Sequence, residues 1–235
     1  MRLQYFSILF FLLVFCKENF SQFYGSSFNF SVSYNYTTTS KLFLQPNSAD
    51  PILRTEFESL DGIYNISFEL RYRVIDQMII SIGSEYIKKT YTNRNFILEG
   101  DRINIKEGYE LIPVELNIYY ELPFSTEKFK FFMGGGGGLY FGKHLREFGD
   151  IEFVDNGSKI GYGINVAVGM DYLLNELISI RGQMRFRDPE LTLFSRYSAP
   201  AVNYGEKRYL LSNSDFSSKV NIDGVTFTIG LAINI

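Results

Sequence analysis

The chain has 235 residues, of which 46% are hydrophobic and 17% aromatic, with 17 Tyr, 23 Phe and no Trp. Its length suits one domain of ordinary size. The formal net charge of −3 lacks the basic excess of a nucleic-acid-binding protein, and a single cysteine excludes an internal disulfide. After the first 16 residues no apolar run is long enough for a membrane helix. The mature chain is therefore either soluble or crosses a membrane as strands.

The first residues are typical of a secretory signal peptide. Arg2 supplies a positive charge, and the apolar run Ile8–Phe15 is shorter than a transmembrane helix requires. Cleavage fits either after Cys16 or after Ser21. A lipid anchor on Cys16 is a further alternative, although Phe15 is large for the residue before a lipidated cysteine. We assign residues 1–21 to the signal peptide and residues 22–235 to the mature domain.

Alternation of apolar and polar residues predicts the mature structure, because side chains alternate between the two faces of a strand. In chain order, eight segments alternate: residues 23–36, 63–74, 78–91, 109–122, 129–142, 160–172, 177–187 and 219–235. Each is long enough for a tilted strand to cross a bilayer. In the last segment Ile222 and Val225 are out of phase, which predicts a bulge near Gly224.

The connections between these segments alternate in length. The short links are residues 75–77, 123–128 and 173–176, and the long polar links are residues 37–61, 92–108, 143–159 and 188–218. Outer-membrane barrels have short periplasmic turns and long extracellular loops, whereas a soluble sandwich has no reason to place every long loop at one end. The sequence thus predicts an all-β, eight-stranded antiparallel up-and-down transmembrane β-barrel in the outer membrane of a Gram-negative bacterium, with outer-membrane lipid as its surroundings.

The polar face of the predicted strands carries five acids and six bases. They are Glu69, Arg71, Arg73, Glu85, Lys89, Glu115, Glu121, Lys130, Asp171, Arg181 and Arg185. Buried charges need partners, so this near-balance predicts an interior ion-pair network. An eight-stranded barrel is narrow enough to be filled by its own side chains, which predicts a plug rather than an open pore.

Aromatic residues recur near the ends of the predicted strands. They are Tyr24, Tyr36, Tyr72, Tyr86, Tyr109, Tyr120, Phe129, Phe141, Tyr162, Tyr172 and Phe186. Barrels of the outer membrane have aromatic girdles at both lipid interfaces, and these residues are candidates for them. The alternative is the ordinary preference of aromatic residues for strands.

One stretch resembles a known group of proteins. Leu111–Tyr120 (LIPVELNIYY) is followed by a short turn and then by a glycine-rich strand from Phe131 to Tyr140. This pairing resembles the small outer-membrane barrels of the OmpA/OmpX kind, and more closely the PorT-like "outer membrane protein beta-barrel domain" of Bacteroidota. The apolar alternation through Ile235 is similar to the signal read by the barrel-assembly machinery, which the resemblance implies as a partner, although Ile235 replaces the usual terminal aromatic.

Other motifs are weaker. The glycines before Lys143 nearly spell a phosphate-binding loop, but the Ser or Thr and the following helix are missing. His144, with Glu147, Asp150, Ser158 or Ser195, is the candidate for a lipid-modifying enzyme, and a surface histidine is the alternative. Asp188, Asp215 and the acidic stretch 150–155 lack an EF-hand spacing, and solvated loop charge is the preferred interpretation. We expect no catalytic residue, no metal and no cofactor.

The preferred function is a monomeric surface barrel whose outer loops serve adhesion, interaction or envelope integrity, because loops on a rigid scaffold commonly carry function. A narrow channel or transporter for small solutes is the main alternative, and a lipid-modifying enzyme is a weaker one. A role in protein secretion rests on family analogy, which fold by itself does not license.

Overall fold

The computed structural model describes residues 28–211 and 215–235 as an almost entirely β structure. The predicted signal peptide, residues 1–21, lies outside this part of the chain. The elements are β1 (Phe28–Thr37), β2 (Lys41–Phe43), α2 (Pro51–Thr55), β3 (Glu58–Ser59), β4 (Ile63–Ile75), β5 (Met78–Leu98), β6 (Asp101–Glu121), β7 (Phe129–Phe148), β8 (Ile151–Ser158), β9 (Gly161–Leu173), β10 (Ile178–Arg187), β11 (Glu190–Tyr197), β12 (Ala201–Tyr204), β13 (Lys207–Leu210), β14 (Phe216–Asn221) and β15 (Val225–Asn234).

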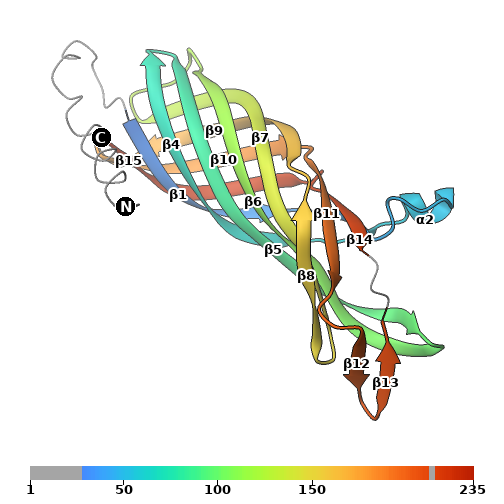
Figure 1. The fold of residues 1–235 in the computed structure, drawn as a ribbon. Coiled ribbons are helices and arrows are strands. Elements are labelled where there is room, and N and C mark those ends of the chain that lie inside the picture. The colour runs from blue at the N-terminus through green and yellow to red at the C-terminus, as the bar shows by residue number, and fades with distance from the viewer. Residues whose placement is uncertain (1–27, 212–214) are drawn as a thin grey trace, which may run out of the picture.

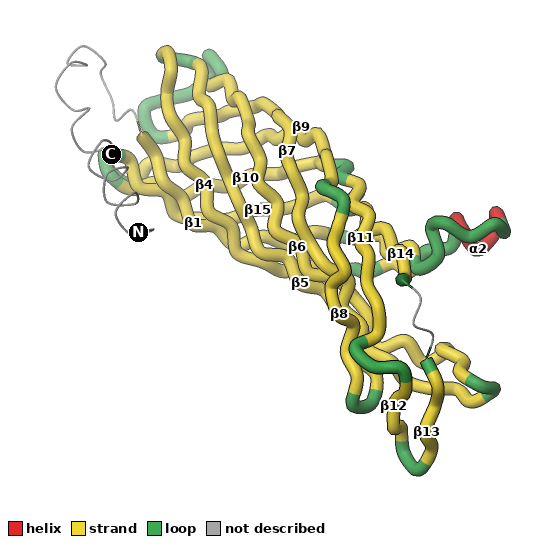
Figure 2. The backbone as a smooth tube through the Cα atoms, viewed as in Figure 1, coloured by secondary structure: helices red, strands yellow, loops and turns green. Residues whose placement is uncertain are grey.

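Eight of these strands form a continuous antiparallel series. The pairings run β1–β4–β5–β6–β7–β9–β10–β15, and β15 pairs again with β1 from Asn29↔Asn234 to Thr37↔Thr226. Figures 1 and 2 show the sheet curling around a long axis. Each segment predicted from the sequence overlaps one of these strands, although residues 23–27 of the first segment lie outside the described residues.

The two faces of this curled sheet differ in polarity. Its outer face exposes apolar side chains on every one of the eight strands, for example Phe30, Phe68 and Ile82. Its inner face buries polar and charged side chains, for example Asn35, Glu115 and Arg181. The alternation read from the sequence therefore has the expected direction, with apolar residues pointing outward and polar residues inward.

The short connections lie together at one end, the turn end. Asp76 and Gln77 join β4 to β5, residues 122–128 join β6 to β7, and residues 174–177 join β9 to β10. At this same end the amide of Phe28 donates to the carbonyl of Ile235 at 3.2 Å, so both ends of the described chain lie beside the short turns (Figure 1).

The expectation of long polar loops at the other end is wrong for three of the four connections. Strands β5, β6 and β7 continue well past the predicted segments, and β5 joins β6 through the two-residue turn Glu99–Gly100, both with positive φ. Strands β8, β11, β14, β2 and β3 extend the same sheet beyond β7, and β12 pairs with β13 as a separate hairpin. We call these strands, together with the far ends of β5, β6 and β7, the extension. Figure 1 shows it projecting past the curled sheet.

The reason for the error is an inversion of polarity along the strands. On β6 the odd-numbered side chains face inward throughout; they are polar at Glu115 and Asn117 but apolar at Ile103 and Ile105. The even-numbered outward side chains change in the opposite sense, from apolar Ile118 to charged Lys106. Apolar side chains point outward at one end of such a strand and inward at the other. The segments predicted from the sequence follow only the outward apolar positions, so each predicted strand stops where the polarity inverts.

The predicted bulge near Gly224 is instead a break in the strand. Strand β14 ends at Asn221 and pairs with β11 and β2. Strand β15 begins at Val225, after three intervening residues, and pairs with β1 and β10. A Cβ atom on Gly224 would lie 2.5 Å from the carbonyl oxygen of Thr39, so the backbone passes too close there for a side chain. The chain changes partners at this point and moves from the extension into the curled sheet.

The glycines of β7 make room for large inward side chains on β6. A Cβ atom added to Gly134 would overlap the backbone of β6 at Ile118 and approach the Tyr119 ring, and one added to Gly136 would overlap β6 at Leu116 and approach Asn117. This agrees with the interpretation of the stretch as a strand with bulky neighbours rather than a phosphate-binding loop.

We expect Gly136→Ala to destabilise the folded protein by about 1–3 kcal/mol, because the added methyl group forces the backbones of β6 and β7 apart. Gly182→Ala on β10 is the control, since a Cβ atom there meets no atom within 4 Å. Urea unfolding in lipid vesicles, followed by the heat-dependent gel shift of folded barrels, measures the difference. Equal stability of the two variants would show that the crowding at β7 is without consequence.

Candidate functional site

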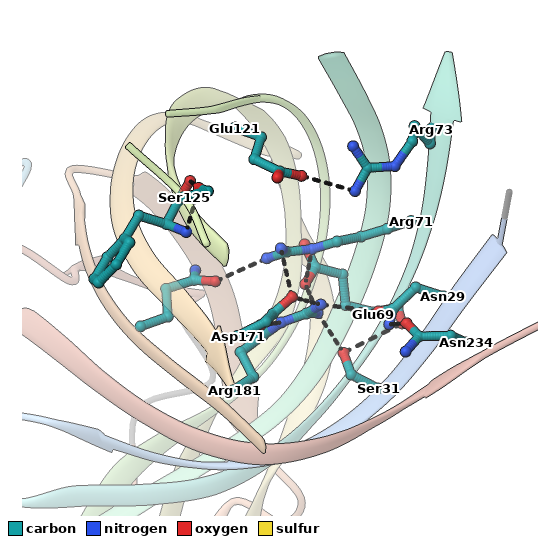
Figure 3. Close-up of polar contacts among 12 residues, drawn as sticks. Asn29, Ser31, Glu69, Arg71, Arg73, Glu121, Ser125, Asp171, Arg181 and Asn234 are labelled. Carbon is teal, nitrogen blue, oxygen red and sulfur yellow. Dashed lines mark hydrogen bonds and ion pairs between the residues drawn. The ribbon is translucent and has the colours of Figure 1, made fainter. Parts of the chain in front are cut away.

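The inward charged side chains of the curled sheet form separate clusters along its long axis, which we name from the turn end. The lower cluster comprises Glu69 on β4, Arg71 on β4, Asp171 on β9 and Arg181 on β10 (Figure 3). Arg181, 1% exposed, holds Asp171 with two hydrogen bonds of 2.7 and 2.9 Å and contacts Glu69 at 3.0 Å. Paired, parallel contacts of this kind are the strongest that guanidinium and carboxylate groups make.

Arg71, the fourth member of the lower cluster, also lies against two aromatic rings. Its guanidinium group donates to Glu69 at 2.9 Å and to Gln183 at 3.0 Å. The same group lies 4.2 Å from the ring centroids of both Tyr119 and Phe132, which is within the range of cation–π attraction. Two acids and two arginines thus neutralise each other across strands that are distant in sequence.

The upper cluster lies further from the turn end and comprises Glu85 on β5, Glu115 on β6, and Arg185 and Arg187 on β10. Arg185 bridges the two acids, at 2.6 Å to Glu115 and 2.9 Å to Glu85, and Arg187 pairs with both as well. Asn65 donates to Glu85 and Tyr140 donates to Glu115, each at 2.5 Å. Again two acids meet two bases.

The remaining predicted charges divide between two places. Glu121 contacts Arg73 at 2.9 Å and Lys130 at 3.3 Å, and these three form a rim cluster beside the short turns. Lys89 lies outside all three clusters, because its ammonium group donates to the backbone carbonyls of Asp61 and Gly62 at 2.5 and 3.1 Å.

Little free space remains between the lower and upper clusters. The cavity there is about 30 Å³, lined by polar groups that include Asn35, Asn117 and Gln183, which is room for one or two water molecules. A wider vestibule of about 1060 Å³ opens at the turn end, between the rim cluster and the lower cluster. The interior therefore narrows from an open vestibule at the turn end to a cavity that holds one or two water molecules.

Above the upper cluster the inward side chains become apolar. The proximal core consists of Leu42, Leu60, Ile63, Ile87, Tyr109, Leu111, Tyr140, Leu191, Leu193, Val220 and Ile222. The distal core consists of Ile103, Ile105, Phe148, Ile151, Tyr197, Val202, Tyr209 and Leu211. Each is a packed apolar cluster, so the extension has a core like that of a water-soluble domain.

A polar group sits within the extension as well. Arg146 pairs with the fully buried Glu107, donates to the Tyr197 hydroxyl at 3.2 Å, and stacks on Phe153 at 4.6 Å. His144, two residues earlier on β7, is buried with its ring against Phe153 at 5.2 Å between centroids.

The structure places three of the catalytic candidates from the sequence in different settings. His144 is 4% exposed, and neither of its ring nitrogens has a hydrogen-bond partner. The Ser195 hydroxyl is likewise buried and without a hydrogen-bond partner, and Glu147 is paired with Lys106 at the surface. Within residues 28–211 and 215–235 no group of three or more His, Cys, Asp and Glu side chains is arranged to hold a metal ion.

The ion-pair network predicted from the sequence does not include Arg187, Glu107 or Arg146. The alternation places Arg187 on the polar face with Arg181, Gln183 and Arg185, and this signal was sufficient to add it to the network. Glu107 and Arg146 were placed in loops, because the polarity inversion hid the strands that carry them. Among the predicted girdle residues Tyr109 is buried in the proximal core, and Tyr24 lies outside the described residues.

No protein-family model matches this sequence, and no curated protein does. Solved structures are similar in fold. OprG, an outer membrane protein of Pseudomonas aeruginosa, is 13% identical, with 89% of this chain and 95% of that one covered and a TM-score of 0.62. Neisserial surface protein A (13% identical, 89% and 98% covered, TM-score 0.49) and Ail, the attachment invasion locus protein of Yersinia pestis (12% identical, 89% and 99% covered, TM-score 0.44), are more distant in shape.

The apolar outer face, the charged interior and the likeness to OprG together define the class of protein: an antiparallel outer-membrane β-barrel protein. Its location is the outer membrane of a Gram-negative cell, with membrane lipid around its apolar face. None of the helices in the described residues is long and apolar enough to cross a membrane. On β7 the exposed apolar belt ends at Phe141, so His144 lies beyond the membrane-spanning segment.

We expect Arg181→Met to destabilise the barrel by about 3–5 kcal/mol, because it leaves two buried carboxylates with one arginine between them. Lys130→Met is the control: its side chain is 35% exposed, and its loss should cost about 0–1 kcal/mol. The measurement is the urea midpoint of each variant in vesicles. If the urea midpoint of Lys130→Met falls as far as that of Arg181→Met, the lower cluster contributes no more to stability than the rim cluster.

Burial, and secondarily the charge of Arg146, lowers the pKa of His144 from its ordinary value of 6.5 to about 3. The unfolded chain therefore binds a proton that the folded chain excludes, and the extension loses stability as the pH falls from 6.5 toward 3. We expect proteolysis of the extension to accelerate at about pH 4.5 relative to neutral pH, and His144→Phe to weaken that dependence. An unchanged dependence in His144→Phe would contradict the assignment to this side chain.

Proposed function

We propose that the chain is a monomeric, non-conducting and non-catalytic outer-membrane protein that presents its extension to the outside of the cell as an interaction surface. In this proposal the ring β1–β4–β5–β6–β7–β9–β10–β15 is an eight-stranded up-and-down barrel that spans the membrane. The turn end faces the periplasm, as short turns do in this class, and the extension is extracellular.

The observation that carries the proposal is the closed interior. Two neutral ion-pair layers cross the barrel and leave a cavity of about 30 Å³ between them. The proximal core, whose members Leu193 and Tyr109 are fully buried, covers the upper cluster from the extension side. A hydrated ion has no continuous path through these layers, which supports a scaffold rather than a channel.

The extension offers a surface of its own. Strand pairing fixes it rigidly to the barrel, because β5, β6 and β7 run unbroken from one part to the other. At its side, helix α2 projects away from the sheet with Ile52 76% exposed and Phe57 44% exposed (Figure 1). Exposed apolar groups on a rigid support are typical of sites that contact other molecules.

The biogenesis that accompanies this function also belongs to the proposal. Residues 1–21 act as the export signal, and the apolar alternation of β15 through Ile235 serves the barrel-assembly machinery. The likeness of residues 111–141 to PorT-like barrels of Bacteroidota suggests that source.

We expect the purified protein to give no steady single-channel steps in planar bilayers, because its interior is sealed at three levels. Steps of constant size that change in Arg185→Ala or Glu115→Ala would overturn the non-conducting assignment and favour the solute channel.

The companion arm of this experiment uses cells that display the protein. Binding of these cells to protein and glycan arrays is compared with that of Ile52→Ser and of a variant lacking the hairpin residues 201–210. Loss of binding in either variant, with the heat-dependent gel shift retained, supports the interaction surface. Identical binding by all three and by cells without the protein contradicts it.

A further inference from the structure

Gly182 is an outward position whose missing side chain is not explained by the packing of the protein itself. On β10 the outward residues are Ile178, Ile180, Gly182, Met184 and Phe186. A Cβ atom at Gly182 would meet no atom within 4 Å, and its φ is not positive. Inward glycines such as Gly136 and Gly169 are crowded, so they are required by packing. Gly182 instead leaves open space where neighbouring positions carry large apolar side chains.

That space is part of a groove of about 520 Å³ on the outer face. Gly182 pairs with Met170 on β9, and Met184 pairs with Val168 on β9 and Phe227 on β15. Together with Met133 on β7, three of the chain's five methionines line this groove. Methionine is flexible and polarisable, so it adapts to apolar ligands of irregular shape.

The groove has a direction across the membrane. Gly182 lies at the middle of β10, and the lining continues to Phe131 and Leu122, next to the short turn that joins β6 to β7. On β10 and β15 the lining reaches Met184 and Phe227, so the groove runs obliquely from the turn end past the middle of the lipid belt. With the orientation proposed above, the end of the groove beside the short turn lies in the periplasmic leaflet, which in outer membranes is made of phospholipid.

We propose that this groove holds one acyl chain of a phospholipid from the periplasmic leaflet; the inference rests on the proposed transmembrane barrel and its orientation. Lipid is as apolar as the groove, so retention comes from van der Waals packing rather than from exclusion of water. A chain lying over Gly182 contacts the backbone and the flanking Met170 and Met184, and it fills space that would otherwise lack partner atoms.

The test is native mass spectrometry of the folded protein in mild detergent after incubation with phosphatidylethanolamine. We expect one retained phospholipid per wild-type molecule and about fivefold less in Gly182→Leu, whose side chain fills the groove. Gly137→Leu is the matched control, because Gly137 also faces outward, lies outside the groove, and has room for a Cβ atom at 3.5 Å from its nearest neighbour. It should retain lipid as the wild type does.

Three results would overturn the inference while leaving the barrel intact. They are equal lipid retention in wild type and Gly182→Leu, preferential retention of lipopolysaccharide, and a wild-type dimer that Gly182→Leu abolishes, which would assign the groove to a second copy of the chain. The heat-dependent gel shift and insertion into vesicles are measured on the same samples. Their absence would overturn the proposed barrel itself, whereas their presence without retained lipid would overturn only the groove.

Discussion

The structure depends on the requirement that every backbone amide and carbonyl in lipid must have a hydrogen-bond partner. A flat sheet fails this requirement at its two edges. Here the pairing of β15 with β1 joins the first and last strands of the series, and the β7–β9 pairing bypasses the extension. These two pairings are the basis of the proposed barrel, in which the eight strands leave no edge in the lipid belt.

Once the strands form a ring, their inward side chains face one another across a narrow space. Polar residues there cannot reach bulk water, so their charges must be neutralised locally. Arg181 and Arg185, four residues apart on β10, do this for carboxylates on β4, β5, β6 and β9. The same arrangement that neutralises the interior also fills it, which supports the proposed scaffold over a pore.

Beyond the lipid belt the surroundings change from hydrocarbon to water, and the polarity of each face changes with them. The extension buries Ile103 and Tyr109 where the barrel buries Glu115, and it exposes Lys106 where the barrel exposes Ile118. Strand β6 thus has one end suited to lipid and the other end suited to water. In the proposed orientation, the level at which this inversion occurs, between Glu110 and Ile112 on β6, is the outer boundary of the membrane.

The sequence by itself determined the strands of the curled sheet, their inward and outward faces, and most of the charges inside, because a period of two is a local property of each strand. It did not determine which charges meet: Arg181 contacts Glu69, 112 residues away, and only the ring places them together. It also missed the extension and the open space over Gly182. Those depend on which strands lie side by side, and tertiary structure alone decides that.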